Sequence, residues 1–316
     1  MRIICATDLL PKSEAAMQRA GLLSDELGAE VTLLHVVEPA PSEQEREQTL
    51  RTALAHVRAR ARLPMRRSVS APDVTVRAGN AARIVREMVA EANAQLLVLG
   101  PHGKRGLRDA FEGSIAENAL AARNCAVLIA RNEAREPYRR VLLALDLSEA
   151  SASAVRAAES LVLTPEVEAR IVHAHEPPYQ GMLHYSGAAP DSIVRYADGW
   201  KREAWHAIED LLIYESTYPA RYDIVIKQRP PVAGILRAVE QFEPDLLVLG
   251  TRAGGRFHRA LHGSVANRVR QKIECDVLVV PEGSFGISRS KVTLGRRHAT
   301  GASVSQRSFP PAPSWP

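Results

Sequence analysis

The sequence is poor in cysteine and in long apolar runs, and both shortages exclude classes of protein. Its three cysteines, Cys5, Cys125 and Cys275, form no CxxC or CxxxxC pair. They fall in apolar runs, which predicts buried thiols in a reducing compartment instead of disulfides or a zinc site. No apolar stretch approaches the length of a membrane span, and the first twelve residues lack a signal-peptide core. We therefore expect a soluble cytoplasmic protein with no membrane partner.

The net charge of +5 does not belong to the body of the chain. Five of the 41 Lys and Arg residues, and none of the 36 Asp and Glu residues, fall after Glu282. Residues 1–282 are therefore neutral, which argues against a nucleic-acid partner. Residues 283–316 are rich in Ser, Arg, Pro and Gly, and we predict a disordered basic tail there.

One stretch with the composition of an anion site follows the apolar run 96–99. Gly100 to Ser114 reads GPHGKRGLRDAFEGS, and the pattern predicts a buried strand, a glycine loop and the start of a helix. Glycines allow close approach of backbone to a ligand, the basic residues add positive charge, and helix N-terminal amides favour anions. A phosphate would fit this loop. The same arrangement recurs 150 residues later, with Gly250, Gly263 and Ser264 at matching positions.

The chain as a whole repeats itself as well. Strand patterns alternate with helix patterns, beginning with a strand at 2–7 and a helix that we expect Ser13 to cap and Gly28 to end. The order restarts at 139, and the second copy carries twelve extra residues within 177–200, expected as a surface excursion, a lid or an interface loop. We predict two α/β domains, 1–131 and 139–282, joined by a linker at 131–138 and followed by the tail 283–316.

The repeated pattern Gly-x2-Gly-x9-Gly-Ser, with an Asp closing the first strand, resembles the universal stress protein family. Supporting segments are ICATD at 4–8, LLHVVEP at 33–39 and CAVLIA at 125–130, each echoed in the second half. The resemblance implies an adenine-nucleotide alpha-hydrolase-like fold, with two tandem doubly wound five-stranded parallel sheets of order 3-2-1-4-5. Ligands favour the switch point between strands 1 and 4. It also implies pairing of the last strands, 126–130 and 276–280, within one chain as a pseudo-dimer or across two chains as a homodimer.

The resemblance further implies ATP, with Mg²⁺ as a possible companion, and a stress-response regulator whose protein partner the sequence does not identify. Val36 would border the adenine, and Asp8 would meet the nucleoside end or a metal ion. The remaining positions would hold ribose and phosphates: Gly100, Gly103, Gly113 and Ser114. The second half matches them with Asp146, Ala174, Gly250, Gly263 and Ser264, but Ala253 replaces the second loop glycine. A methyl group there opposes close approach of phosphate, although Gly254 and Gly255 follow at once.

Other interpretations stay open. No motif supplies a nucleophile or general base, so we predict no catalytic residues. The alternatives are a slow magnesium-dependent ATPase, and a non-nucleotide-binding interaction and dimerisation module in which Asp8 and Asp146 only bond local amides. His173 and His175 lie two apart on a strand with His184 nearby, but no Cys or carboxylate completes a recognised spacing, so no metal site is predicted.

Overall fold

Strands and helices alternate along the chain, as the periodicity predicts. The structure is a computed structural model, and it describes residues 1–61, 71–101, 115–116, 119, 125–251 and 265–285. The first half contains β1 (Arg2–Thr7), η1 (Pro11–Ser13), α1 (Glu14–Leu27), β2 (Glu30–Val37), α2 (Glu43–Ala61), β3 (Asp73–Ala78), α3 (Ala81–Glu91), β4 (Leu96–Leu99) and β5 (Ala126–Ile129). The second contains β6 (Arg140–Ala144), α5 (Glu149–Leu161), β7 (Glu168–His175), α6 (Gln180–Tyr185), α7 (Pro190–Glu215), η3 (Pro219–Arg221), β8 (Tyr222–Gln228), α8 (Pro231–Phe242), β9 (Leu246–Thr251), α9 (Val265–Arg270) and β10 (Asp276–Pro281).

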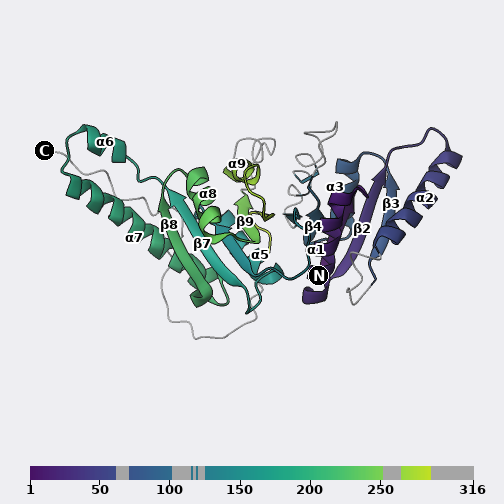
Figure 1. Cartoon of the computed structure of the whole chain (residues 1–316), viewed down its shortest axis with the longest axis horizontal. Helices are drawn as coiled ribbons and strands as arrows, with labels where there is room; N and C mark the ends of the chain where they lie inside the picture. The colour runs from purple at the N-terminus through teal and green to yellow at the C-terminus, as the bar shows by residue number, and fades with distance from the viewer. Residues whose placement is uncertain (62–70, 102–114, 117–118, 120–124, 252–264, 286–316) are drawn as a thin grey trace, which may run out of the picture.

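The described strands form one ten-stranded sheet. Its order is β3-β2-β1-β4-β5-β10-β9-β6-β7-β8, so each half contributes five strands in the order 3-2-1-4-5. Neighbours within each half are parallel, whereas β5 and β10 pair antiparallel at the centre, with Leu128 opposite Leu278. The predicted pairing of the last strands is therefore confirmed, and it occurs within one chain. Figure 1 shows the two halves side by side, with α2 and α7 at opposite ends.

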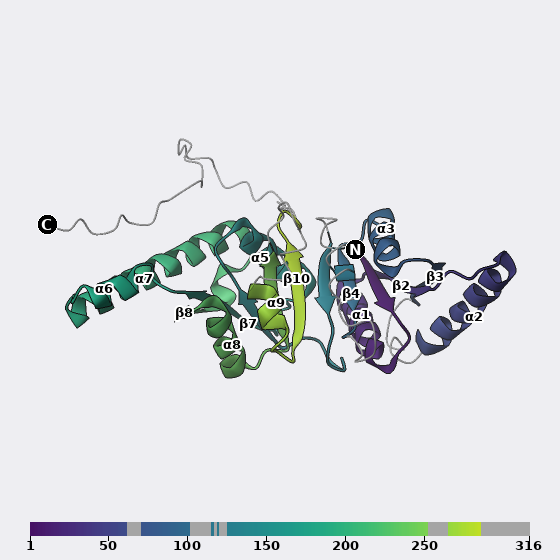
Figure 2. The same ribbon diagram turned by 90° about the horizontal axis from the view of Figure 1, so that it is seen from above.

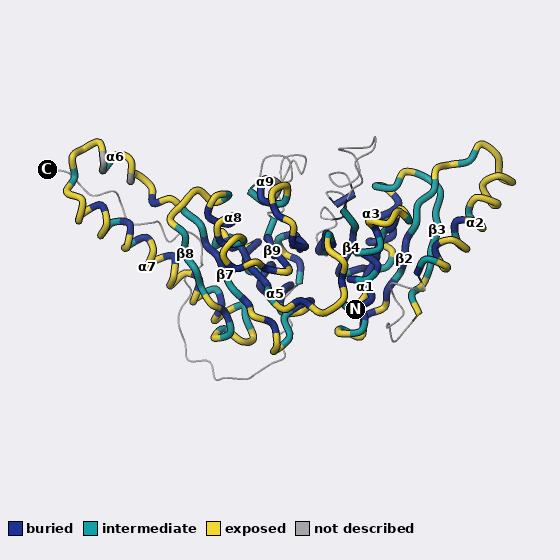
Figure 3. Tube along the Cα trace, viewed as in Figure 1, coloured by how far each residue is buried: buried dark blue, intermediate teal, exposed yellow. Residues whose placement is uncertain are grey.

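Each face of the sheet has a hydrophobic core that runs through both halves. One core packs beneath α1, α2, α5 and α7 and includes Leu128 and Leu278. The other packs beneath α3, α8 and α9. Figure 2 shows helices on both sides of the sheet, and in Figure 3 buried residues follow the strands while exposed residues follow the outer sides of α2, α6 and α7. None of the described helices is long and apolar enough to cross a bilayer.

Local signals explain some helix ends and fail at others. Gly28 ends α1 in the left-handed region, at φ 60°, as expected. Ser13, by contrast, makes no side-chain cap, so the predicted cap is wrong. The side chain of Ser13 is buried, and its Oγ lies 2.8 Å from both the Thr7 Oγ1 and the Leu10 carbonyl oxygen. A turn of 3-10 helix precedes α1, and Ser13 bonds to that turn instead of to the helix amides.

The twelve extra residues of the second half are helical. They form α6 and lengthen α7 to 26 residues, compared with 19 in α2. Figure 1 shows α6 folded back beside the first turns of α7, beyond β8. The excursion is thus a helical extension at one end of the molecule, and not an irregular loop.

The segment 131–138 is fastened to both halves by a buried carboxylate. Asp276, 1% exposed at the start of β10, accepts hydrogen bonds from the backbone N–H of Arg131 at 2.7 Å and from the hydroxyl of Tyr138 at 2.7 Å. Its Oδ2 also lies 3.4 Å from Nε of buried Arg19 in α1. The Arg19 guanidinium stacks 3.7 Å from the centre of the Tyr138 ring and donates to the Glu136 carbonyl. Desolvation by burial, with the Asp276 charge second, raises the pKa of Tyr138 well above its usual value.

Candidate functional site

The carboxyl ends of β1 and β4 lie side by side, and the chain leaves them in opposite directions. Ala6 of β1 pairs with Leu99 of β4, so Asp8 and Gly100 follow neighbouring strand ends at one edge of the sheet. This is the switch point at which open α/β sheets bind ligands. The structure therefore brings together two of the residues that the sequence singled out.

Asp8 forms a tight turn as it leaves β1. Its Oδ1 accepts a hydrogen bond from the Leu10 N–H at 3.0 Å, and Leu9 between them has φ 61°. A left-handed leucine is strained and persists only where its surroundings enforce it. The Asp8 side chain is exposed, and among the described residues only its Oδ1 has a hydrogen-bond partner. One carboxylate oxygen thus stabilises the turn, while the other remains available to a ligand.

The second half repeats this turn with more internal bonds. Leu147 has φ 62°, and Asp146 Oδ1 accepts from the Ser148 N–H at 3.1 Å. The same oxygen also accepts from the hydroxyl of Ser148 at 2.5 Å and from that of Ser151 at 3.0 Å. Because a carboxylate that serves three local donors has less capacity for a ligand, Asp146 is the poorer candidate.

A histidine supports each turn, a role that the sequence analysis assigned to neither His35 nor His173. Nδ1 of His35 lies 2.8 Å from the Thr7 carbonyl oxygen, and Nδ1 of His173 lies 2.8 Å from the Leu145 carbonyl oxygen. A carbonyl only accepts, so Nδ1 carries the proton and Nε2 is the nitrogen left to face a ligand. The sequence signal was present, because His173 repeats His35 at the same offset of 138 that relates Asp146 to Asp8.

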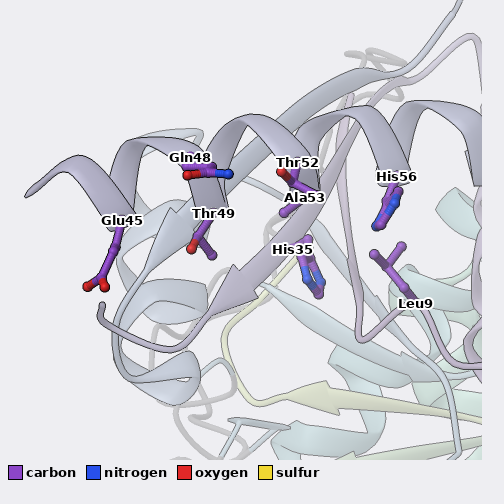
Figure 4. Close-up of a pocket in the computed structure, with 8 residues that line it drawn as sticks. All are labelled: Leu9, His35, Glu45, Gln48, Thr49, Thr52, Ala53 and His56. Atoms are coloured by element: carbon purple, nitrogen blue, oxygen red, sulfur yellow. The ribbon is translucent and has the colours of Figure 1, made fainter. Parts of the chain in front are cut away.

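Beside Asp8, a hollow of about 430 Å³ opens between α2 and the sheet (Figure 4). Leu9 and His35 form its floor, and one face of α2 forms its wall. That wall consists of polar and small side chains: Glu45, Gln48, Thr49, Thr52, Ala53 and His56. The volume lies within the range of small-molecule sites. Sequence reasoning missed the α2 residues because a polar helix face reads as a solvated one.

Val36 and Gly100 have structural roles that the sequence analysis did not assign, and the ligand contacts that the resemblance implies for them stay predictions. Val36 is partly buried and packs against the core beneath α3, on the face opposite His35, because successive strand residues alternate. A Cβ on Gly100 would lie 3.0 Å from Ser13 Cα, and one on Gly250 would lie 2.5 Å from the Ala150 carbonyl oxygen. These two glycines therefore let η1 and α5, respectively, pack closely against the strands.

Five predicted positions lie outside the described residues: Gly103, Gly113, Ser114, Gly263 and Ser264. Ala253 and the expected helix at 112–122 also fall there, apart from residues 115–116 and 119. Their phosphate-binding role stays a prediction.

A comparison with known families agrees with the strand order, the paired turns and the repeated sequence motifs. The model of the Universal stress protein family matches residues 1–131 and again residues 137–281. The chain belongs to the universal stress protein family. Two successive matches also establish the tandem arrangement.

Named relatives in this family each match about one half of the chain. Universal stress protein A homolog 1 of Coxiella burnetii is 29% identical over 140 residues, which is 40% of this chain and 92% of the relative. A universal stress protein encoded in the QAH/OAS sulfhydrylase 3′ region of Thermus aquaticus is 28% identical over 145 residues, which is 45% of this chain and 98% of the relative. A solved universal stress protein from Archaeoglobus fulgidus shares the fold over 89% of this chain and 98% of its own, with TM-score 0.64 and 19% identity.

The two halves of this tandem universal stress protein differ where the resemblance places the adenine. The second half has Ala174 in place of Val36, and α8 carries Gly234 where α3 has Ile84. A Cβ on Gly234 would lie 2.5 Å from the Cβ of Ala174, so α8 packs directly on this position. The small residues allow helix and strand to approach closely.

Acid should weaken the second half of this universal stress protein through His173. Burial, only partly offset by the bond to Leu145 and the charge of Asp146, lowers the pKa of His173, and burial also lowers that of His175, which stacks on it at 5.1 Å. Below about pH 6.5 the unfolded chain therefore binds more protons than the folded one, and stability falls as pH falls towards the folded pKa.

Urea unfolding at pH 7.5 and 5.5 should show a larger loss of unfolding free energy on acidification for the wild type than for His173→Gln. Ile171→Val, a non-titrating change in the same strand, should keep the wild-type pH dependence; an equal loss in all three proteins would contradict the assignment.

Proposed function

We propose that this protein is a stress-response regulator that binds an adenine nucleotide, ATP with Mg²⁺, in its first half. The observation that carries the proposal is the convergence, at the ends of β1 and β4, of Asp8, the hollow floored by Leu9 and His35, and the start of the basic glycine stretch 100–114. A nucleoside fits a hollow of about 430 Å³. Phosphates fit a loop of glycines and basic residues before a helix.

Several features of the chain support one site per molecule. Asp8 has one oxygen without a partner among the described residues, whereas Asp146 accepts three local donors through a single oxygen. The second half also has Ala253 in place of a loop glycine. Both differences favour the first half.

Binding is favoured over turnover. Hydrolysis of ATP needs a group that orients or deprotonates water, and no motif in the sequence supplies a recognised general base. Asp8 would hold a magnesium ion or the ribose, and His35 would contact the nucleoside. A bound nucleotide would then be a signal that changes the stability or surface of the first half.

Calorimetric titration of the full chain with Mg-ATP tests the proposal. We expect one site per chain. Gly113→Asp, which places a carboxylate beside the phosphates, should weaken binding at least about 100-fold, because like charges in contact cost several kcal/mol. Asp8→Ala should weaken it about 10-fold or more through loss of a charged hydrogen bond.

The matched changes in the second half, Gly263→Asp and Asp146→Ala, provide the control and should leave affinity unchanged. Absence of any heat of binding at several temperatures would show that the glycine stretches serve the fold alone and would favour the interaction module. Magnesium-dependent release of ADP that disappears in Asp8→Ala would establish the ATPase instead.

A further inference from the structure

The solvent-facing side of the second half of α7 carries both acidic and large apolar residues. Residues 203–215 contain four acidic residues and no Lys or Arg. Ala204, Ile208 and Leu212 face the core, which leaves the opposite side of the helix to solvent. We call this side the α7 outer face, and it comprises Glu203, Trp205, Glu209, Asp210, Ile213 and Tyr214. Ile213 is 65% exposed and Tyr214 is 78% exposed.

The corresponding helix of the first half does not share these properties. The last turn of α2 carries Arg58 and Arg60, and no large exposed hydrophobic residue of the described chain lies on α2. Figure 3 shows that both helices are largely exposed on their outer sides. Over residues 43–61, the fold therefore accepts an outer helix side without large exposed hydrophobic residues.

Two of the acidic residues on this face have no ion-pair partner among the residues that the structure describes. Glu209 lies 3.2 Å from the ring of His206, and Glu215 pairs with Arg156. Glu203 and Asp210 pair with no described basic residue. A ligand for this face needs positive charge together with apolar side chains.

The segment that follows β10 ends beside the helix that carries this face. After β10, the Gly283 N–H donates to Ser153 Oγ at 3.0 Å, and the Phe285 carbonyl accepts from Arg156 Nε at 2.5 Å. Phe285 packs against the core beneath α5 and α7. Because Arg156 also pairs with Glu215 in the last turn of α7, the described chain ends close to the C-terminal turn of the helix that carries this face.

The sequence that follows Phe285 complements the face in charge and character. Residues 287–297 read ISRSKVTLGRR, with four basic residues, three apolar residues and no acid. Eleven extended residues span up to about 36 Å, and the thirteen residues of the face span about 20 Å of helix. A segment tethered by so short a link has an effective concentration of about millimolar, so weak contacts suffice to hold it.

We propose that residues 287–297 bind the α7 outer face of the same chain. Arg289, Lys291, Arg296 and Arg297 pair with Glu203, Glu209 and Asp210, while Ile287, Val292 and Leu294 cover Trp205, Ile213 and Tyr214. This proposal revises the expectation of a tail that is disordered throughout, and it is independent of nucleotide binding.

Paramagnetic relaxation measured on the full chain tests the proposal. A nitroxide is attached at Thr300→Cys; Cys5, Cys125 and Cys275 stay unmodified, because burial raises the pKa of the first two thiols to about 12 and that of Cys275 to about 11. We expect broadening of the amide signals of residues 203–210 and none on α2. Raising salt from 0.1 to 1 M should remove most of the broadening, because the Debye length falls from about 10 to 3 Å.

Charge reversal separates binding from simple tethering. The double change Glu209→Lys with Asp210→Lys should at least halve the broadening. Each exposed ion pair changes the equilibrium constant for binding of the segment by roughly a few-fold. Adding Arg289→Glu and Lys291→Glu should restore the broadening, and Glu47→Lys on α2 should have no effect. Broadening that does not change with these substitutions, or the absence of any broadening, would overturn the proposal. Broadening that appears only when labelled and unlabelled chains are mixed would assign the face to a second copy and overturn it equally.

Discussion

Replacing Asp276 by Ala should lower the free energy of unfolding by about 3–5 kcal/mol, because it leaves a buried guanidinium without its counter-charge. Asp276 and Arg19 have side chains 1% and 8% exposed. The change also removes the acceptor of the Arg131 and Asn132 N–H groups and of the Tyr138 hydroxyl. Urea denaturation monitored by circular dichroism measures the loss directly.

An exposed ion pair of the same type provides the control. Asp223 lies 2.7 Å from Arg170 but has a side chain 57% exposed, so Asp223→Ala should change stability by less than about 1 kcal/mol. Combining Asp276→Asn with Arg19→Met should recover part of the loss, since removing both charges leaves neither one unpaired. A loss of under 1 kcal/mol in Asp276→Ala would mean that the network is not desolvated as the structure indicates.

Leu128→Ala should cost about 2–5 kcal/mol and should destabilise both halves of the molecule together. Leu128 lies opposite Leu278 at the join between β5 and β10, and both are 1% exposed. They belong to a core that continues from one half into the other. Unfolding of one half would expose the join of its partner, so we expect a single cooperative transition.

The tryptophans make this prediction easy to check. All three, Trp200, Trp205 and Trp315, lie in the second half or after it, so their fluorescence reports on a part of the chain that Leu128 does not belong to. Leu34→Ala, a buried change in β2 three strands from β5, should shift the tryptophan transition by a similar amount. A tryptophan transition unmoved by Leu34→Ala would show that the halves unfold separately, and would falsify the cooperative unit.

Much of the fold followed from patterns that are local or repeated. The run at 96–99 became β4 with the predicted bounds, and Gly28 ended α1, because burial period and left-handed caps depend on a few neighbouring residues. Ser13 misled us because a serine before a helix predicts a cap whether or not a tighter turn intervenes. The helical form of the insertion at 177–200 was not predicted, since its Gly and Pro residues are compatible with an irregular loop as well as with two helices joined by a turn.

The candidate site was predicted less completely. Motif spacing selected Asp8 and Gly100, and the sheet brings both strand ends to one edge. The side chains of α2 that wall the hollow were not predictable, because their part in it depends on how far a helix stands from the sheet. The structure adds a reason for Gly100 that the sequence did not show, which is the close approach of η1, while close approach of a ligand stays a prediction.

The sequence by itself determined the two-fold repeat, the alternation of strands and helices, and the neutrality of residues 1–282, because each depends only on residue order and composition. The tertiary structure alone decided that β5 and β10 join the halves into one sheet, that Asp276 holds segment 131–138, and that Asp8 is less occupied than Asp146. The reason is physical. Strand pairing and the burial of charges depend on contacts between residues more than a hundred positions apart. The number of hydrogen bonds that a carboxylate accepts depends on which donors its turn brings within reach. Spacing along the chain records neither of these.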